Sequence, residues 1–173
     1  MTGKGLAGHE SQRAVSVDWF TPSWIFEALG LSFDLDPCAP VGGVPWVPAA
    51  NHYSAYDNGL TKPWTGRVWL NPPYGKLTGK FLARMHDHRD GIALVFGRTD
   101  TAWFHAYAAT SDAILFMAGR IAFVDGRGVT GGSGAGAGSI LIAWGADNVR
   151  ALERFQSLRG GMLRISHNER IAA

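Results

Sequence analysis

The stretch Asn71-Pro72-Pro73-Tyr74 has the residue types that could most readily do chemistry. Its two prolines lack backbone N–H donors and fix two φ angles, and the first keeps Asn71 out of the helical region. The carbonyl oxygens of Asn71 and Pro72 can accept the two hydrogens of an exocyclic amine. Tyr74 offers a ring face on which an unstacked base can lie. The stretch therefore predicts a site for a flat, amine-bearing base, with a proline-rich strand exit as the structural alternative.

Buried strands and helices are needed to position this corner. The apolar run from Val68 to Leu70 predicts the strand that leads into it, and Gly75 predicts a turn after it. The run from Gly91 to Phe96 is almost fully apolar, as is typical of a central parallel strand. Further strands are expected at residues 33–36, 113–117 and 162–165, helices at 76–86 and 148–158, and a hairpin with arms at 120–124 and 139–144. The alternation indicates one α/β domain with a central, mostly parallel sheet and an antiparallel terminal hairpin.

A second candidate region lies before the corner. Thr21-Pro22 is a helix start signal, with Thr at the N-cap and Pro at the first helical position. Asp36 ends an expected strand, and a loop containing Gly42-Gly43 follows it. An acidic strand end before a glycine-bearing loop is a common way to bind a nucleotide-type cofactor. The alternative for Asp36 is a turn aspartate that binds its own backbone.

Basic residues near the corner are candidates for phosphate contacts. Lys76, Lys80 and Arg84 follow one another at spacings of four and share one face of the expected helix. A solvated charged face is the alternative for these three. Arg98 follows an expected strand end, where it could reach phosphate or form an ion pair with Asp100. The candidate DNA-binding residues are Lys76, Lys80, Arg84, Arg98, Arg120 and Arg127.

The overall composition sets limits on the class of protein. A chain of 173 residues that is 46% hydrophobic suits one domain with a real core. No stretch has the length of a membrane span, and no apolar signal-peptide core is present, so we expect a cytoplasmic protein. A single cysteine and six scattered histidines predict neither disulfides nor a metal site. The net charge of +2 permits nucleic-acid binding without arguing for it.

The sequence resembles the amino-methyltransferases that depend on S-adenosylmethionine, and in particular the small phage and prophage DNA adenine-N6-methyltransferases. The matching pieces cover most of positions 18 to 144 in the order found in that family. They are Trp19-Phe20-Thr21-Pro22, Phe33 to Ala39, Asp57-Asn58-Gly59-Leu60 with Trp64, Val68 to Gly75, Arg98-Thr99-Asp100-Thr101 with Trp103-Phe104, and Gly119-Arg120-Ile121 with Phe123. Each piece is weak alone, and the ordered set is specific.

The resemblance implies a Rossmann-like methyltransferase fold with S-adenosylmethionine as cofactor and DNA as substrate, in a bacterial host and without metal or membrane. It assigns the catalytic role to Asn71, Pro72, Pro73 and Tyr74. It assigns cofactor binding to Thr21, Pro22, Asp36, Pro37, Cys38, Ala39, Asp57 and Leu60. The loop after Asp36 looks like a degraded form of the D-P-F/C-x-G-x-G loop of amino-methyltransferases.

The implied reaction methylates the exocyclic amine of an adenine that has left the duplex. The chain is too short for a separate recognition domain, so we expect short or relaxed sequence specificity, read by the loops at 40–56 and 125–138. The second of these loops is rich in glycine and is expected to be flexible, as is a polar tail at residues 1–16. Two alternatives stay open. One is the same chemistry on RNA adenine, cytosine or a protein glutamine, and the other is a non-catalytic DNA-binding protein.

Overall fold

The structure is a computed structural model that describes residues 20–125, 127, 129–130 and 137–166. The expected tail at residues 1–16 lies outside the described residues. So do residues 126, 128 and 131–136, which form most of the expected glycine-rich loop.

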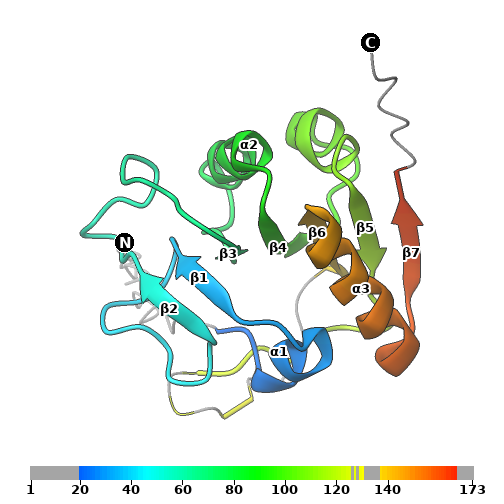
Figure 1. Cartoon of the computed structure of the whole chain (residues 1–173), viewed down its shortest axis with the longest axis horizontal. Coiled ribbons are helices and arrows are strands. Elements are labelled where there is room, and N and C mark those ends of the chain that lie inside the picture. Colours follow the sequence, from blue (N-terminus) through cyan, green and yellow to red (C-terminus); the bar gives the residue numbers. More distant parts are fainter. Residues whose placement is uncertain (1–19, 126, 128, 131–136, 167–173) are drawn as a thin grey trace, which may run out of the picture.

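The described residues form one sheet of seven strands (Figure 1), in the order β2-β1-β3-β4-β6-β5-β7. The strands are β1 (Phe33–Asp36), β2 (Ala49–His52), β3 (Val68–Leu70), β4 (Gly91–Phe96), β5 (Ala113–Phe116), β6 (Ser139–Trp144) and β7 (Met162–Ile165). The first four pair in parallel. The pairs β4–β6, β5–β6 and β5–β7 are antiparallel. The result is a mixed sheet in which the late strand β6 is inserted between β4 and β5.

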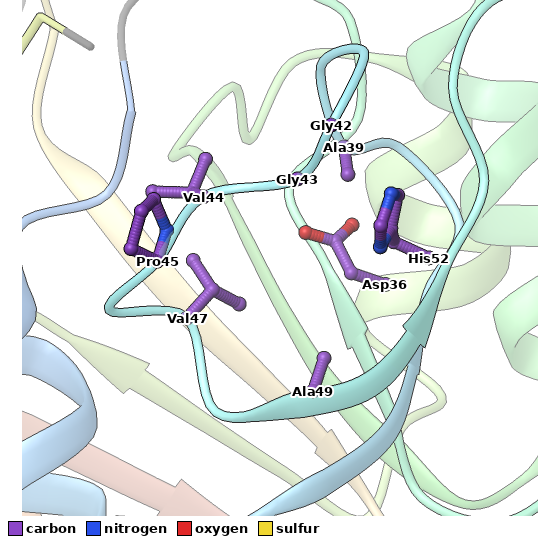
Figure 2. A pocket seen from close by; sticks show the side chains of 9 residues that line it. All are labelled: Asp36, Ala39, Gly42, Gly43, Val44, Pro45, Val47, Ala49 and His52. Carbon is purple, nitrogen blue, oxygen red and sulfur yellow. The ribbon is translucent and has the colours of Figure 1, made fainter.

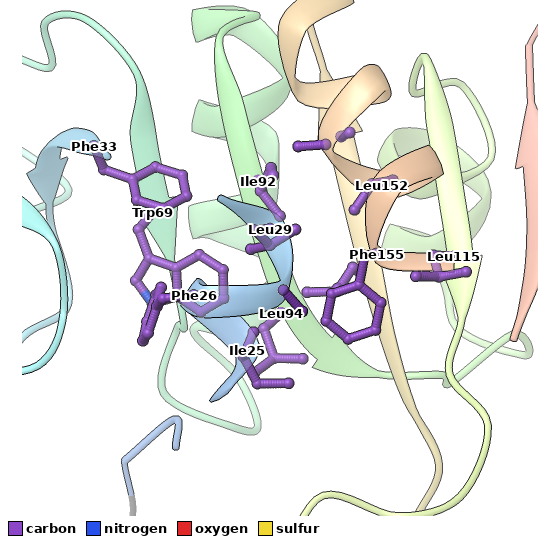
Figure 3. Packing of buried hydrophobic residues seen from close by; sticks show 14 of the residues in the cluster. Ile25, Phe26, Leu29, Phe33, Trp69, Ile92, Leu94, Leu115, Leu152 and Phe155 are labelled. Carbon is purple, nitrogen blue, oxygen red and sulfur yellow. The ribbon is translucent and has the colours of Figure 1, made fainter. Parts of the chain in front are cut away.

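Helices cover both faces of this sheet (Figure 1). One face packs against α1 (Ser23–Leu29) and α3 (Ala146–Arg159), and the other packs against α2 (Thr78–His88) and the π-helical turn η1 (Phe104–Ala108). On the first face, Ile25, Phe26 and Leu29 of α1 meet Trp69 and Leu94 (Figure 3). Strands buried on both faces explain the continuous apolar runs in the sequence.

Helix α1 ends as expected but begins differently. Gly30 adopts a left-handed conformation, with φ 63°, and its N–H binds the carbonyl of Phe26. Pro22, rather than Thr21, occupies the N-cap, and no side chain caps the helix. The Thr21 hydroxyl does not cap the helix and instead accepts a hydrogen bond from Asn71 Nδ2.

Most expected elements are confirmed with small changes at their ends. The strands at 33–36, 68–70, 91–96 and 162–165 have the expected bounds, and the strand expected at 113–117 ends at Phe116. Helix α2 begins at Thr78, two residues later than expected, so Lys76 precedes it. Its inward residues are Phe81, Leu82 and Met85, as expected.

Two expectations about the sheet are wrong. Residues 120–124 are not one arm of a hairpin with β6, because β6 pairs with β4 and β5 instead. Val124 forms only isolated bridges, with Phe20 and Thr130. The connection at 40–56 is also not wholly irregular, since β2 adds a short edge strand to β1.

Candidate active site

The carboxyl ends of three neighbouring parallel strands form the centre of the site. Asp36 ends β1, Asn71 follows β3, and Phe96 ends β4. The register pairs Leu35 with Val68 and Leu70 with Ala93, so the three ends lie along the same edge of the sheet. Ligands in open α/β sheets bind at this edge.

The amide of Asn71 is held on one side only. Its Nδ2 donates a hydrogen bond of 3.4 Å to the hydroxyl of Thr21, fifty positions earlier in the chain. Its Oδ1 is buried and has no hydrogen-bond partner among the described residues. A buried acceptor without a partner is costly, and that cost is recovered when a donor binds it. The arrangement is therefore suited to accept a hydrogen from a ligand.

The two prolines differ in what their carbonyls contact. The Pro73 carbonyl accepts a hydrogen bond of 2.9 Å from the Thr78 hydroxyl, at the start of α2. The Pro72 carbonyl accepts none from the described part of the chain. Pro72 itself is buried, whereas Pro73 is exposed. The corner thus offers two open acceptors, Asn71 Oδ1 and the Pro72 carbonyl, to match the two hydrogens of an amine.

The ring of Tyr74 stacks on the ring of Phe96. The ring centroids are 4.1 Å apart and the planes differ by 5°. Tyr74 is 47% exposed, so the stack on Phe96 does not bury the residue. Desolvation raises the pKa of its hydroxyl to about 12, so the hydroxyl stays protonated at neutral pH. Phe96 was not among the predicted site residues, although its position as the last residue of a buried strand was a usable signal.

A cavity of about 250 Å³ lies beside the end of β1 (Figure 2). The carboxylate of Asp36 points into it, next to the ring of His52. Gly42 and Gly43, with φ of 84° and 71°, carry the loop around its rim. Of the expected cofactor-binding residues, Asp36 and Ala39 line the cavity.

Burial sets the chemistry of the Asp36 region. It raises the pKa of Asp36 to about 7, against an ordinary value of 3.8, and the backbone N–H of Cys38 partly opposes the shift. That N–H donates to Asp36 Oδ1 at 3.0 Å, so the turn alternative for Asp36 is present in the structure. The same bond still leaves Asp36 Oδ2 available to a ligand. Burial, and next the charge of Asp36, raise the pKa of the Cys38 thiol.

The expected segment Asp57 to Leu60 lies against the turn that follows Asp36. A Cβ at Gly59 would come within 2.2 Å of the Pro37 carbonyl, so only glycine allows this approach. Asp57 itself is exposed and accepts hydrogen bonds from the backbone N–H and the hydroxyl of Ser54, which lower its pKa. The structure therefore brings the segment to the site but uses the Asp57 side chain within its own turn.

The candidate DNA-binding residues have different surroundings. Lys76, Lys80 and Arg98 are exposed, and Arg98 forms none of the ion pairs found among the described residues. The guanidinium of Arg84 binds the carbonyls of Leu60 and Lys62 and lies 5.0 Å over the Trp64 ring.

The two further candidates are Arg120 and Arg127. Arg127 pairs with Asp125 through a contact of 2.7 Å, and Arg120 is exposed. Arg84 and Arg127 are therefore engaged within the protein, unlike Lys76 and Lys80.

The described residues define an α/β protein with one mixed seven-stranded sheet, in which the Asn71-Pro72-Pro73-Tyr74 corner lies at the carboxyl end of β3. The chain belongs to the DNA N-6-adenine-methyltransferase (Dam) family, whose model matches residues 9–157. Neither the curated proteins nor the solved structures that were compared with the chain contain a match. Membership supports DNA adenine methyltransferase activity in general and implies S-adenosylmethionine as the methyl donor.

Two other kinds of site are absent from the described part of the chain. It contains no group of three or more His, Cys, Asp or Glu side chains that could hold a metal ion. No helix within it is long and apolar enough to cross a membrane.

Proposed function

We propose that the protein transfers a methyl group from S-adenosylmethionine to the N6 amine of an adenine that has left the DNA duplex. The observation that carries this proposal is the pair of open acceptors at the catalytic corner. Asn71 Oδ1 is buried without a partner, and the neighbouring Pro72 carbonyl is equally unpaired among the described residues.

The two acceptors would activate the amine. The N6 nitrogen of adenine is a poor nucleophile because its lone pair is delocalised into the ring. Hydrogen bonds from its two hydrogens to Asn71 Oδ1 and the Pro72 carbonyl favour a tetrahedral nitrogen, whose lone pair is available for attack. Rigid prolines suit this role because positioning contributes much of the rate enhancement in such reactions.

Tyr74 would hold the base after it leaves the duplex. Enzymes that modify a base inside DNA must extrude it, and aromatic rings commonly stack on the extruded base. With Phe96 on one face of Tyr74, the base would take the other face. The base would then lie between the ring and the open acceptors of the corner.

The Asp36 cavity fits the proposed cofactor. Asp36 Oδ2 can accept hydrogen bonds from an ammonium group or ribose hydroxyls, and the glycine-bearing rim lets backbone approach a ligand. When bound, S-adenosylmethionine supplies an electrophilic methyl group. Pro22, Pro37, Cys38, Ala39, Asp57 and Leu60 complete the proposed cofactor region. The Rossmann-like methyltransferase architecture belongs to the same proposal.

The exposed lysines suit the path of the DNA backbone. Lys76 and Lys80 flank the corner on the side of α2, and Arg98 follows β4. We assign phosphate contacts to these three first, since the guanidiniums of Arg84 and Arg127 are engaged within the chain. Short or relaxed sequence specificity, read by loops around the corner, belongs to the same proposal. A phage or prophage setting in a bacterial host belongs to the same proposal.

The test is transfer of tritium from labelled S-adenosylmethionine to unmethylated DNA, followed by nucleoside analysis of the product. Wild type and Asn71→Ala are compared, with cofactor binding measured by calorimetry for both. We expect label in N6-methyladenine from wild type only, while Asn71→Ala still folds and binds the cofactor. Asn51→Ala is the matched control, because its side chain is exposed and its one hydrogen bond among the described residues goes to the Asp34 carbonyl, at 3.2 Å.

Other outcomes would redirect the proposal. Cofactor binding without label in DNA would favour RNA adenine, cytosine or a protein glutamine as the acceptor. Failure of wild type to bind the cofactor would favour the non-catalytic DNA-binding alternative, which the degraded loop after Asp36 supports. Loss of cofactor binding in a folded Asn71→Ala protein would contradict the role given to Asn71.

A further inference from the structure

Thr21 lies between the catalytic corner and the loop that borders the Asp36 cavity. It is 2% exposed. Its hydroxyl accepts the hydrogen bond from Asn71 Nδ2, at 3.4 Å, and its carbonyl accepts one from the indole N–H of Trp46, at 2.8 Å. Trp46 belongs to the loop that borders the cavity. The residues on either side of it, Pro45 and Val47, line that cavity.

The orientation of the Asn71 amide decides whether the corner can accept or only donate. The oxygen and nitrogen ends of an amide have nearly the same shape, so their hydrogen-bond partners determine which end faces a ligand. With Nδ2 held by the Thr21 hydroxyl, Oδ1 is the end left without a partner. In the reverse orientation, the Asn71 NH2 group would face the substrate amine. Both groups are hydrogen-bond donors, so no hydrogen bond would form between them.

We propose that Thr21 is a positioning residue, which holds the Asn71 amide with its oxygen toward the substrate and is itself held by Trp46. This proposal rests on the proposed function but differs from the cofactor contact that the resemblance implies for Thr21. A cofactor contact predicts a change in cofactor affinity when the hydroxyl is removed. A positioning role predicts a change in turnover and in the amide of Asn71, with cofactor affinity preserved.

The test compares Thr21→Val, which replaces the hydroxyl by a methyl group of similar shape, with Thr21→Ser, which keeps it. The first readout does not need activity. The side-chain amide signals of Asn71 in a ¹H–¹⁵N spectrum are assigned by their loss in Asn71→Ala. We expect their hydrogen exchange to be about fivefold faster in Thr21→Val, as for loss of one hydrogen bond, and near the wild-type rate in Thr21→Ser.

The second readout is steady-state methyl transfer. Thr21→Val should lower kcat about fivefold with the cofactor dissociation constant unchanged, and Thr21→Ser should restore most of it. Trp46→Phe, which removes the indole N–H and keeps an aromatic ring, should lower kcat in the same direction but by less. Thermal unfolding of each variant shows whether the fold is retained.

Several outcomes would overturn the proposal. Unchanged amide exchange in a folded Thr21→Val protein would do so, whether or not the wild type is active. Weakened cofactor binding with unchanged kcat would return Thr21 to the cofactor site. An inactive wild type would defeat the proposed function instead, and the exchange measurement would still decide the role of Thr21.

Discussion

The rings of Tyr74 and Phe96 lie in parallel planes, with centroids 4.1 Å apart, although the residues come from different strand ends. Tyr74 follows β3, and Phe96 is the last residue of the neighbouring strand β4. Phe96 therefore already covers one face of the Tyr74 ring in the protein without a ligand. At most one face of the ring is left for a base, and the stack fixes the direction of that face before any ligand arrives.

Phe96→Leu should weaken target-base binding about fivefold, since a stacked aromatic pair contributes about 0.5–1.5 kcal/mol beyond its buried area. The leucine fills most of the space but gives Tyr74 no flat surface to rest on. The measurement is the fluorescence of 2-aminopurine at the target position in duplex DNA, together with cofactor affinity, which should not change. Phe116→Leu is the control because Phe116 is also a half-buried strand end, on β5. Equal effects from both variants would contradict the role of Phe96.

Tyr74→Ala should reduce methyl transfer by about tenfold or more, because stacking of one base on an aromatic ring is worth about 1–3 kcal/mol. Tyr74→Phe should retain much of the activity, since the hydroxyl has a pKa of about 12 and stays neutral through the working range of pH. Tyr56→Ala is the control, because Tyr56 is 89% exposed. A folded but inactive Tyr74→Phe would mean that the hydroxyl rather than the ring is needed.

Cofactor affinity should rise with pH until about pH 7, where Asp36 becomes ionised. Below that value the protonated carboxyl accepts fewer hydrogen bonds, and affinity should fall by up to about tenfold per pH unit. Isothermal calorimetry between pH 5 and pH 9 measures this. Asp36→Asn should bind weakly at every pH. His52 also lines the cavity, so His52→Gln must keep the profile if Asp36 is its source.

The same group should affect stability in the opposite direction. The pKa of Asp36 is higher in the folded protein than its ordinary value of 3.8, so the folded state holds the proton more tightly. Stability should therefore decline as the pH rises from about 4 through 7, because the unfolded carboxyl ionises first. Asp36→Asn removes this decline and keeps an oxygen for the Cys38 N–H. A comparison of thermal midpoints for both proteins across this pH range checks the sign.

Lys80 and Arg84 are four residues apart on α2 but should behave differently when replaced. Lys80→Ala should lower DNA affinity and reduce the salt slope of binding by about one. Arg84→Ala should cost about 1–2 kcal/mol of stability, because its guanidinium binds two backbone carbonyls and the Trp64 ring. Salt titrations of DNA binding and denaturant unfolding separate the two effects. Arg164→Ala, on the far edge strand β7, is the control for both.

The sequence predicted the buried strands well because both of their faces are covered, which makes each a continuous apolar run. Strand β2 was not predicted, since Ala49 to His52 contains no β-branched or aromatic residue. It joins the sheet through backbone pairing with β1, a contact that leaves no pattern in side-chain types. The hairpin expectation was wrong because β6 pairs with a strand more than forty residues earlier in the chain.

The sequence indicated the motif residues of the candidate site, but it did not indicate which side chains contact one another. The residues around Asn71 and Asp36 are recognisable from local order, because Asn71 directly follows a strand and Asp36 ends one. The contact between Asn71 and Thr21 joins positions fifty apart, and the stack of Tyr74 on Phe96 joins two strands. Such contacts depend on the order of strands in the sheet, which local patterns do not specify.

The position of β6 also bears on how the protein is made. A chain leaving the ribosome has β1 to β4 by residue 96, but the open edge of β4 has no neighbour until Ser139 to Trp144 emerges. At about 5–20 residues per second that wait lasts roughly 2–10 s. During this interval an apolar strand edge is exposed, a state that favours aggregation. The strand that carries Phe96, and with it the support for Tyr74, therefore gains its second neighbour late in translation.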